Sequence, residues 1–203
     1  MKKLALFLSL IIISVVTFSF VNSPPEELAL NAAIPQGDYK MKDVSGKTTS
    51  LNEVKTAKGL LVIFSCNTCP YVKLSEARIK EYSDYCLANG IGCALINSNE
   101  AQRSEDDSFD KMLAYFTAQK LRCTYAVDEK SQLANAFGAT RTPQCFLFNA
   151  KGLVYKGAID DNVKDAAAVK APYLKDALAS LLKNETPKTQ ETKSIGCTIK
   201  RLE

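Results

Sequence analysis

The sequence predicts an α/β fold in which a central mixed β-sheet is flanked by helices and followed by a C-terminal tail. Residues 60–64 form a continuous apolar run, which is typical of a strand buried on both faces of a sheet. A helical pattern over residues 69–89 follows this strand directly. Residues 145–155 show a strand, a turn with a late glycine and a second strand, which indicates a hairpin. The order β, α, β, α, β-hairpin, α therefore joins a βαβ unit to an antiparallel pair.

The long helix and the strand after it show the clearest pattern. Val72, Ile79 and Cys86 recur at a constant interval, so they form one buried stripe along the helix. Gly90 is suited to ending this helix, and residues 93–96 form the next buried strand. The other expected elements are a turn at 43–47 between two short strands, a helical turn at 51–54, a loop at 97–108, a helix at 109–119, an extended segment at 123–127, helical turns at 131–137 and a final helix at 165–182.

The chain is expected to have four parts. They are a signal peptide or signal anchor at 1–23, a linker at 24–36, the folded domain at 37–185 and a polar C-terminal tail at 186–203. Lys2 and Lys3 precede residues 4–21, which carry no charge, and this pattern predicts export. Lysines before an apolar run stay inside, so the domain is expected to be periplasmic or extracytoplasmic. The sequence leaves open whether the leader is cleaved or tethers the domain to the membrane through residues 4–21.

Composition excludes several kinds of chemistry. The chain has no histidine, which excludes an imidazole base and imidazole metal ligands. A formal net charge of +4 gives no reason to expect a nucleic acid partner. The cysteine count is 7, and an odd number in an oxidising compartment leaves at least one cysteine free or paired with another molecule.

Cys66 and Cys69 form the strongest motif, a cysteine pair between the first buried strand and the first long helix. Unpaired amide groups and the positive end of the helix dipole favour a thiolate there, and only the thiolate attacks a disulfide. The second cysteine is close enough to resolve a mixed disulfide. Pro70 suits the first turn of a helix, where no intrahelical bond is donated.

The Cys66–Cys69 pair has two structural alternatives to redox use, a zinc site and a static disulfide. A zinc site needs two more ligands, but the sequence offers no second pair of this spacing and no histidine. A static disulfide across so short a loop gains little entropy. Redox use is therefore the favoured interpretation, with no metal and no cofactor expected.

Thr142-Pro143 is the second motif, and it lies just before the strand at residues 145–148. A cis bond at Pro143 would turn the chain sharply into this strand beside the cysteine pair. It would also leave the backbone of Thr142 free to pair with an extended substrate chain. The alternative is an ordinary trans proline that opens a strand.

These motifs resemble the redoxin branch of the thioredoxin superfamily, which includes peroxiredoxin-like proteins and membrane-tethered thiol reductases. The similarity extends over roughly residues 37–182, and its matching segments are 60–72, 125–128, 133–138, 141–143, 146–149 and 152–157. The resemblance implies a thioredoxin-like fold, with Cys66 as nucleophile, Cys69 as resolving cysteine and Pro143 as the cis-proline. It further implies protein thiols and disulfides as partners, together with an electron donor that the sequence does not identify.

Two departures from the family pattern bear on the direction of electron transfer. Ser65 stands where a tryptophan is common, and the residues between the cysteines include no histidine. Without a histidine to steady the thiolate, Cys66 should be less acidic and its disulfide less oxidising. This favours a reductase or a disulfide-shuffling role over a strong oxidase.

The remaining cysteines are expected mainly in the core. Free cysteine is among the most buried residue types, so core filling is the default for Cys86, Cys93, Cys123 and Cys145. A Cys86–Cys93 disulfide and an approach of Cys145 to Cys66 are alternatives. Cys197 differs, because it lies in a small apolar island at 194–200 within the polar tail. It is a candidate third redox cysteine, or else the island simply docks on the domain.

Three other functions are alternatives to thiol–disulfide exchange. A peroxidase needs a proline and a threonine just before its cysteine, and residues 61–65 contain neither, although Arg141 could polarise a peroxide. A copper-delivery module would require a histidine, which the chain lacks. A thioredoxin-like binding module with a vestigial pair is the non-enzymatic alternative.

Overall fold

The computed structural model describes residues 26–202. The predicted export segment lies outside the described residues. Within this described range, no helix combines the length and the apolar character that a membrane span requires.

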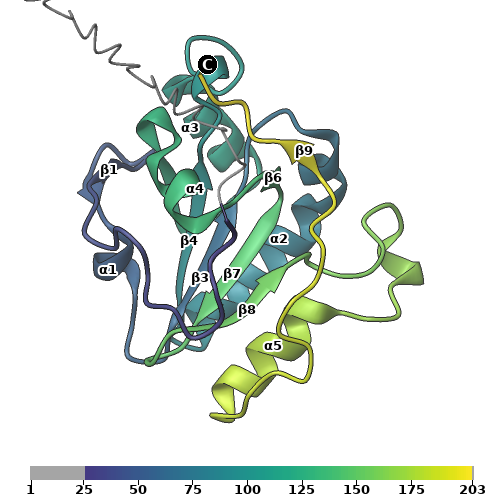
Figure 1. Cartoon of the computed structure of the whole chain (residues 1–203). Helices are drawn as coiled ribbons and strands as arrows, with labels where there is room; N and C mark the ends of the chain where they lie inside the picture. The colour runs from purple at the N-terminus through teal and green to yellow at the C-terminus, as the bar shows by residue number, and fades with distance from the viewer. Residues whose placement is uncertain (1–25, 203) are drawn as a thin grey trace, which may run out of the picture.

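A five-stranded mixed sheet forms the centre of the molecule (Figure 1). Its spatial order is β5 (Thr124–Val127), β4 (Gly92–Asn97), β3 (Leu60–Phe64), β7 (Gln144–Phe148) and β8 (Leu153–Gly157). Strands β3, β4 and β5 are parallel, whereas β7 and β8 are antiparallel to their neighbours. The predicted mixed sheet is therefore confirmed, and β3 lies at its centre.

Strand β3 explains why the apolar run has no polar member. Its residues Leu61 and Ile63 join one apolar cluster, while Leu60, Val62 and Phe64 join another on the opposite face. All five side chains are completely buried. A strand covered on both faces needs apolar side chains at every position.

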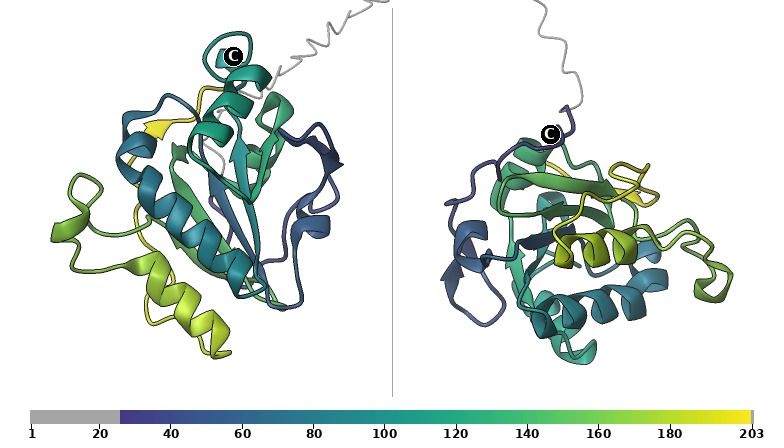
Figure 2. Two further views of the ribbon diagram at one scale, coloured as in Figure 1. Left: turned by 180° about the vertical axis from the view of Figure 1, so that it is seen from behind. Right: turned by 90° about the horizontal axis from the view of Figure 1, so that it is seen from below.

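Helices cover both faces of the sheet. The first cluster includes residues of α2 (Pro70–Ala88), α3 (Phe109–Ala118) and α5 (Tyr173–Leu182), and the second includes α1 (Leu51–Val54) and α4 (Gln132–Phe137). The view from behind in Figure 2 shows α2 and α5 lying across the first face. The smaller elements are β1 (Met41–Lys42), β2 (Thr48–Thr49), β6 (Arg141–Thr142), β9 (Cys197–Thr198) and the 3-10 turns Glu100–Gln102, Glu129–Ser131 and Ala166–Ala168.

The final helix is shorter than the sequence pattern suggested. The prediction of one helix over 165–182 is wrong in its first half, because α5 begins only at Tyr173. Pro172 occupies the position before the helix, and a proline disfavours helical geometry in the residue that precedes it. The alanine-rich segment upstream forms a separate 3-10 turn.

Both ends of the described chain pack on the domain. Leu28, Leu30 and Ile34, within the segment expected as a linker, pack against the second apolar cluster. At the other end, Ile199 is buried in the same cluster, and β9 pairs with β6. Figure 1 shows the yellow tail running past β8 to reach β6.

Candidate functional site

Strand β3 and helix α2 together position the cysteine pair. The chain leaves β3 at Phe64, Cys69 occupies the N-cap position, and Pro70 opens the helix. Cys66 and Cys69 are both buried, with exposed fractions of 1% and 4%. The unpaired amide groups of the first helical turn therefore lie beside two sulfurs that have little contact with solvent.

Thr142 contacts both sulfurs. The Thr142–Pro143 peptide bond is cis. The hydroxyl oxygen of Thr142 lies 3.4 Å from Cys66 Sγ, and the Thr142 carbonyl oxygen lies 3.2 Å from Cys69 Sγ. The structure thus brings Thr142 against Cys66 and Cys69, from which it is 76 and 73 positions away in the sequence.

Cys197 joins the same site from the tail. Its Sγ lies 2.7 Å from Cys69 Sγ, and all the cysteines of residues 26–202 are free thiols. The antiparallel pairing of β6 and β9 sets Cys197 opposite Thr142. Ile195 of the tail and Pro143 line one small pocket. The backbone edge beside Pro143 is therefore occupied by the chain's own C-terminal segment.

The three thiols differ in acidity because they share hydrogen bonds. The pKa of Cys66 is raised, first by its hydrogen bond to Cys69 and then by burial. The pKa of Cys69 is lowered to about 4, chiefly because Cys66 donates to it and also because Cys197 does. Burial and the contact with Cys69 raise the pKa of Cys197 to about 11. Negative charge in this arrangement therefore resides on Cys69.

The weak acidity expected for Cys66 agrees with the direction of its pKa shift, but the physical cause differs. The expectation was based on the missing histidine. In the structure, the hydrogen bond to the Cys69 sulfur and burial hold the proton on Cys66, whereas the hydroxyl of Thr142 favours its thiolate.

A buried aspartate, which sequence reasoning missed, supports the loop between the cysteines. Asp107 Oδ1 accepts from the Asn67 backbone amide over 2.9 Å and from Asn97 Nδ2 over 2.7 Å. The Tyr125 hydroxyl donates to Asn67 Oδ1 over 2.8 Å. Asp107 is completely buried. These bonds fix Asn67, and with it the turn that separates Cys66 from Cys69.

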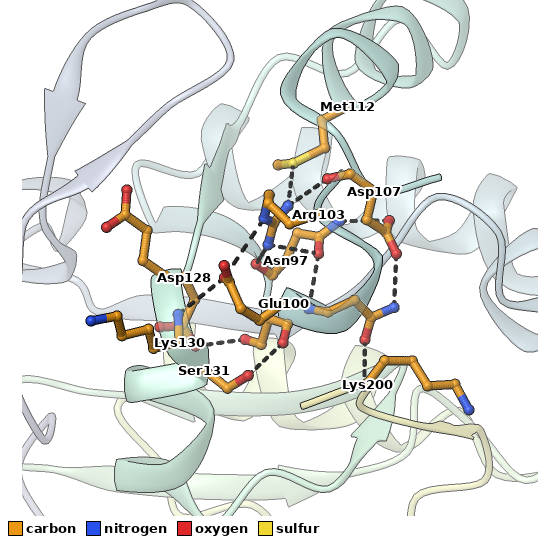
Figure 3. A network of polar contacts seen from close by, with 12 residues as sticks. Asn97, Glu100, Arg103, Asp107, Met112, Asp128, Lys130, Ser131 and Lys200 are labelled. Atoms are coloured by element: carbon orange, nitrogen blue, oxygen red, sulfur yellow. Dashed lines mark hydrogen bonds and ion pairs between the residues drawn. The ribbon is translucent and has the colours of Figure 1, made fainter. Parts of the chain in front are cut away.

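The Asp107 network also reaches the tail (Figure 3). Asn99 Nδ2 donates to Asp107 Oδ2, and the Lys200 amide donates to Asn99 Oδ1, each over 2.9 Å. Arg103 closes the network by donating to the Asp107 carbonyl over 2.6 Å. The polar run at residues 97–108 follows a parallel strand, and α/β proteins commonly form binding sites at such strand ends. This run is the sequence signal from which the Asp107 network could have been predicted.

The other predicted residues lie outside this contact set. Cys86 and Cys123 neighbour Cys93 in the core, and the hydrogen bonds that Cys93 makes to both raise its pKa. Cys145 pairs with Ile63 across β3 and β7 and is completely buried. Arg141 Nη1 donates to the Gly196 carbonyl and to Thr198 Oγ1, over 3.3 and 3.1 Å. The arginine considered for peroxide chemistry is therefore bound to the tail.

A mixed sheet in this order, with a cysteine pair at the start of the helix after its central strand, defines a thioredoxin-like protein. The chain belongs to the Redoxin family, whose model matches residues 29–173. No curated protein sequence matches it.

Three solved structures illustrate the similarity. A hypothetical protein from Sinorhizobium meliloti 1021 is 29% identical with a TM-score of 0.77, and the match covers 88% of this chain and 97% of that one. An uncharacterized conserved protein from Geobacillus kaustophilus is 27% identical with a TM-score of 0.79, covering 89% and 94%. A protein provisionally named thiol:disulfide interchange protein DsbE, from Chlorobium tepidum, is 16% identical with a TM-score of 0.57, covering 78% and 98%, and supports the fold alone.

Proposed function

We propose that the protein is an exported thiol–disulfide oxidoreductase, with a reductase or disulfide-shuffling role, that uses Cys66 and Cys69. The observation that carries this proposal is the contact of Thr142 with both sulfurs at the head of α2. Membership of the Redoxin family supports the same class of chemistry. Its substrates are protein disulfides and thiols, and a separate thiol donor or acceptor returns the pair to its starting state.

The reduced pair contains its own base. Cys66 donates to Cys69, so the Cys66 proton passes along this hydrogen bond and leaves a Cys66 thiolate beside the Thr142 hydroxyl. That thiolate attacks a substrate disulfide, forms a mixed disulfide and releases the first substrate thiol. Cys69 then gives up its proton and attacks the Cys66 sulfur, which releases the second substrate thiol and leaves a Cys66–Cys69 disulfide.

An extended substrate chain would pair with the backbone of Thr142. In the closed arrangement that edge is paired with Cys197. Protein substrates therefore bind after β9 has moved away from β6. The apolar residues 4–21 would direct the domain to an extracytoplasmic compartment, where they either leave with the leader or tether the domain to the membrane.

Insulin reduction with dithiothreitol as electron donor tests this function. The wild-type chain should accelerate the reaction, and Cys66→Ser should abolish the acceleration. Cys145→Ala is the matched control, because it removes a completely buried thiol that lies outside the contact set and should keep activity. Peroxide consumption that depends on Cys66 would favour a peroxidase, whereas inactivity in both assays would favour a binding module.

A further inference from the structure

Hydrogen bonds along the segment from Gln190 to Arg201 hold the C-terminal tail against the domain. The Thr192 amide donates to the Lys156 carbonyl over 3.0 Å, and the Ile199 amide donates to the Thr140 carbonyl over 3.0 Å. Arg201 Nη2 donates to the Ala139 carbonyl over 2.6 Å. Contacts on both sides of Cys197 therefore fix where its sulfur lies.

The position of the tail makes Cys197 the entry point to the site. Cys66 and Cys69 are almost completely buried beneath it, whereas Cys197 is half-buried. An external thiol therefore reaches the Cys197 sulfur more easily than either sulfur of the pair. Of the two, only Cys69 is in hydrogen-bond contact with Cys197.

We propose that Cys197 is the third cysteine of an internal disulfide relay, which transfers the disulfide from Cys66–Cys69 to Cys69–Cys197. The proposal rests on the function proposed above, because it needs the Cys66–Cys69 disulfide as its starting point. It assigns electron entry to the tail and substrate reduction to Cys66.

The relay consists of two balanced exchanges. In the first, the Cys197 thiolate attacks Cys69 Sγ, the Cys69–Cys197 bond forms, and the Cys66–Cys69 bond breaks as Cys66 leaves as a thiolate. In the second, a thiol of an external protein dithiol attacks the Cys197 sulfur, and Cys69 leaves as a thiolate. The second thiol of the donor then frees Cys197. The donor ends as a disulfide, and its two protons and two electrons reside on Cys66 and Cys69.

The acidity of Cys69 supports the order of these exchanges. A thiol with a low pKa leaves faster from a disulfide. In this step Cys197 is bound covalently and has no thiol proton to donate, so the hydrogen bond from the Cys66 thiol, which is the main cause of the lowered pKa of Cys69, is the one that remains. That bond makes Cys69 a better leaving group than Cys197. Attack of the donor on the more accessible Cys197 sulfur therefore releases Cys69 and completes the reduction of the pair.

Disulfide mapping in a Cys66→Ser chain tests whether Cys69 and Cys197 exchange. After treatment with glutathione disulfide, acid quenching and alkylation, mass spectrometry should find a Cys69–Cys197 disulfide. In the matched Cys66→Ser/Cys197→Ser control, Cys69 should instead carry glutathione. Glutathione retained on Cys69 with Cys197 alkylated in the single variant would overturn the relay.

A kinetic comparison distinguishes the relay from a tail that only shields the cysteine pair from solvent. Reduced thioredoxin, used as the probe protein dithiol, should reduce the preformed Cys66–Cys69 disulfide about tenfold more slowly in Cys197→Ser than in wild type. Equal or faster reduction in the variant would overturn the relay while leaving the proposed function intact. Failure of the wild-type chain to form a Cys66–Cys69 disulfide at all would instead count against the function itself.

Discussion

Thr142 and Cys197 are paired across two short antiparallel strands, and this pairing puts Cys197 Sγ 2.7 Å from Cys69 Sγ. The threonine that touches both sulfurs of the cysteine pair thus also holds the tail. The same backbone edge serves the chain's own C-terminus and, in the function proposed above, a substrate. Access to the pair is therefore coupled to the position of β9.

Gly196→Ala should loosen this pairing. A Cβ at position 196 would lie 2.2 Å from the Thr142 carbonyl oxygen, so β9 must shift away from β6. We expect faster alkylation of Cys66 and Cys69 by iodoacetamide, measured by peptide mass spectrometry. Ser194→Ala is the matched control, because it removes a buried hydroxyl without a hydrogen-bond partner and should leave the alkylation rate unchanged. Unchanged rates in Gly196→Ala would show that the tail does not limit access.

Asp107→Ala should destabilise the fold. The substitution leaves the Asn67 amide and two asparagine side chains without their buried acceptor, which costs about 1–3 kcal/mol per unsatisfied group. Urea unfolding measures the loss. The control is Asp106→Ala, whose side chain is 51% exposed and bonds only to Lys111. Similar stability losses in both variants would contradict the role assigned to the buried carboxylate.

Stability of the reduced protein should depend on pH through Cys69. Its pKa in the folded state is lowered to about 4, below the ordinary thiol value of about 8.5. A lowered folded-state pKa contributes stability that is fully present above the unfolded pKa and is lost as the pH falls through the folded value. The stability difference between wild type and Cys69→Ser should therefore grow from pH 4 to pH 8. A constant difference in urea unfolding would argue against a Cys69 thiolate.

Cys197→Ala should make the Cys66–Cys69 disulfide harder to reduce. The hydrogen bond between Cys197 and Cys69 helps to lower the pKa of Cys69, so it stabilises the reduced state of the pair. A pair whose reduced form is stabilised is a stronger oxidant, and removal of this hydrogen bond should shift the reduction potential to a more negative value. Equilibration with glutathione buffers measures the potential. A shift of the reduction potential to a less negative value would show that the Cys197–Cys69 hydrogen bond does not stabilise the reduced protein.

The central parts of the fold could be predicted because they depend on local patterns. Leu61 and its apolar neighbours indicated a strand buried on both faces, and Cys69-Pro70 indicated the start of a helix. The final helix was expected over 165–182 from its amphipathic pattern, but it begins only at Tyr173, after Pro172. Because a proline disfavours helical geometry in the residue before it, Pro172 is a sequence signal for a helix that begins after it.

The polar support of the site depends on long-range contacts, which periodicity does not reveal. Asp107 meets Asn67 across 40 positions of the chain, and Cys197 meets Cys69 across 128. The sequence predicted Cys197 as a candidate third redox cysteine in an apolar island, but it did not predict how the tail docks. Cys197 is held in place by backbone pairing with Thr142. Backbone hydrogen bonds do not require particular side chains, so the sequence does not reveal them.

Trapping of mixed disulfides tests the proposed thiol–disulfide exchange most directly. A Cys69→Ala chain, expressed in cells that export it, retains Cys66 but lacks the cysteine that resolves its mixed disulfides. We expect protein partners that are joined through Cys66, are released by reductant and are absent from a Cys66→Ser/Cys69→Ala chain. Recovery of no partner, or of the same partners with the double variant, would contradict the proposed exchange.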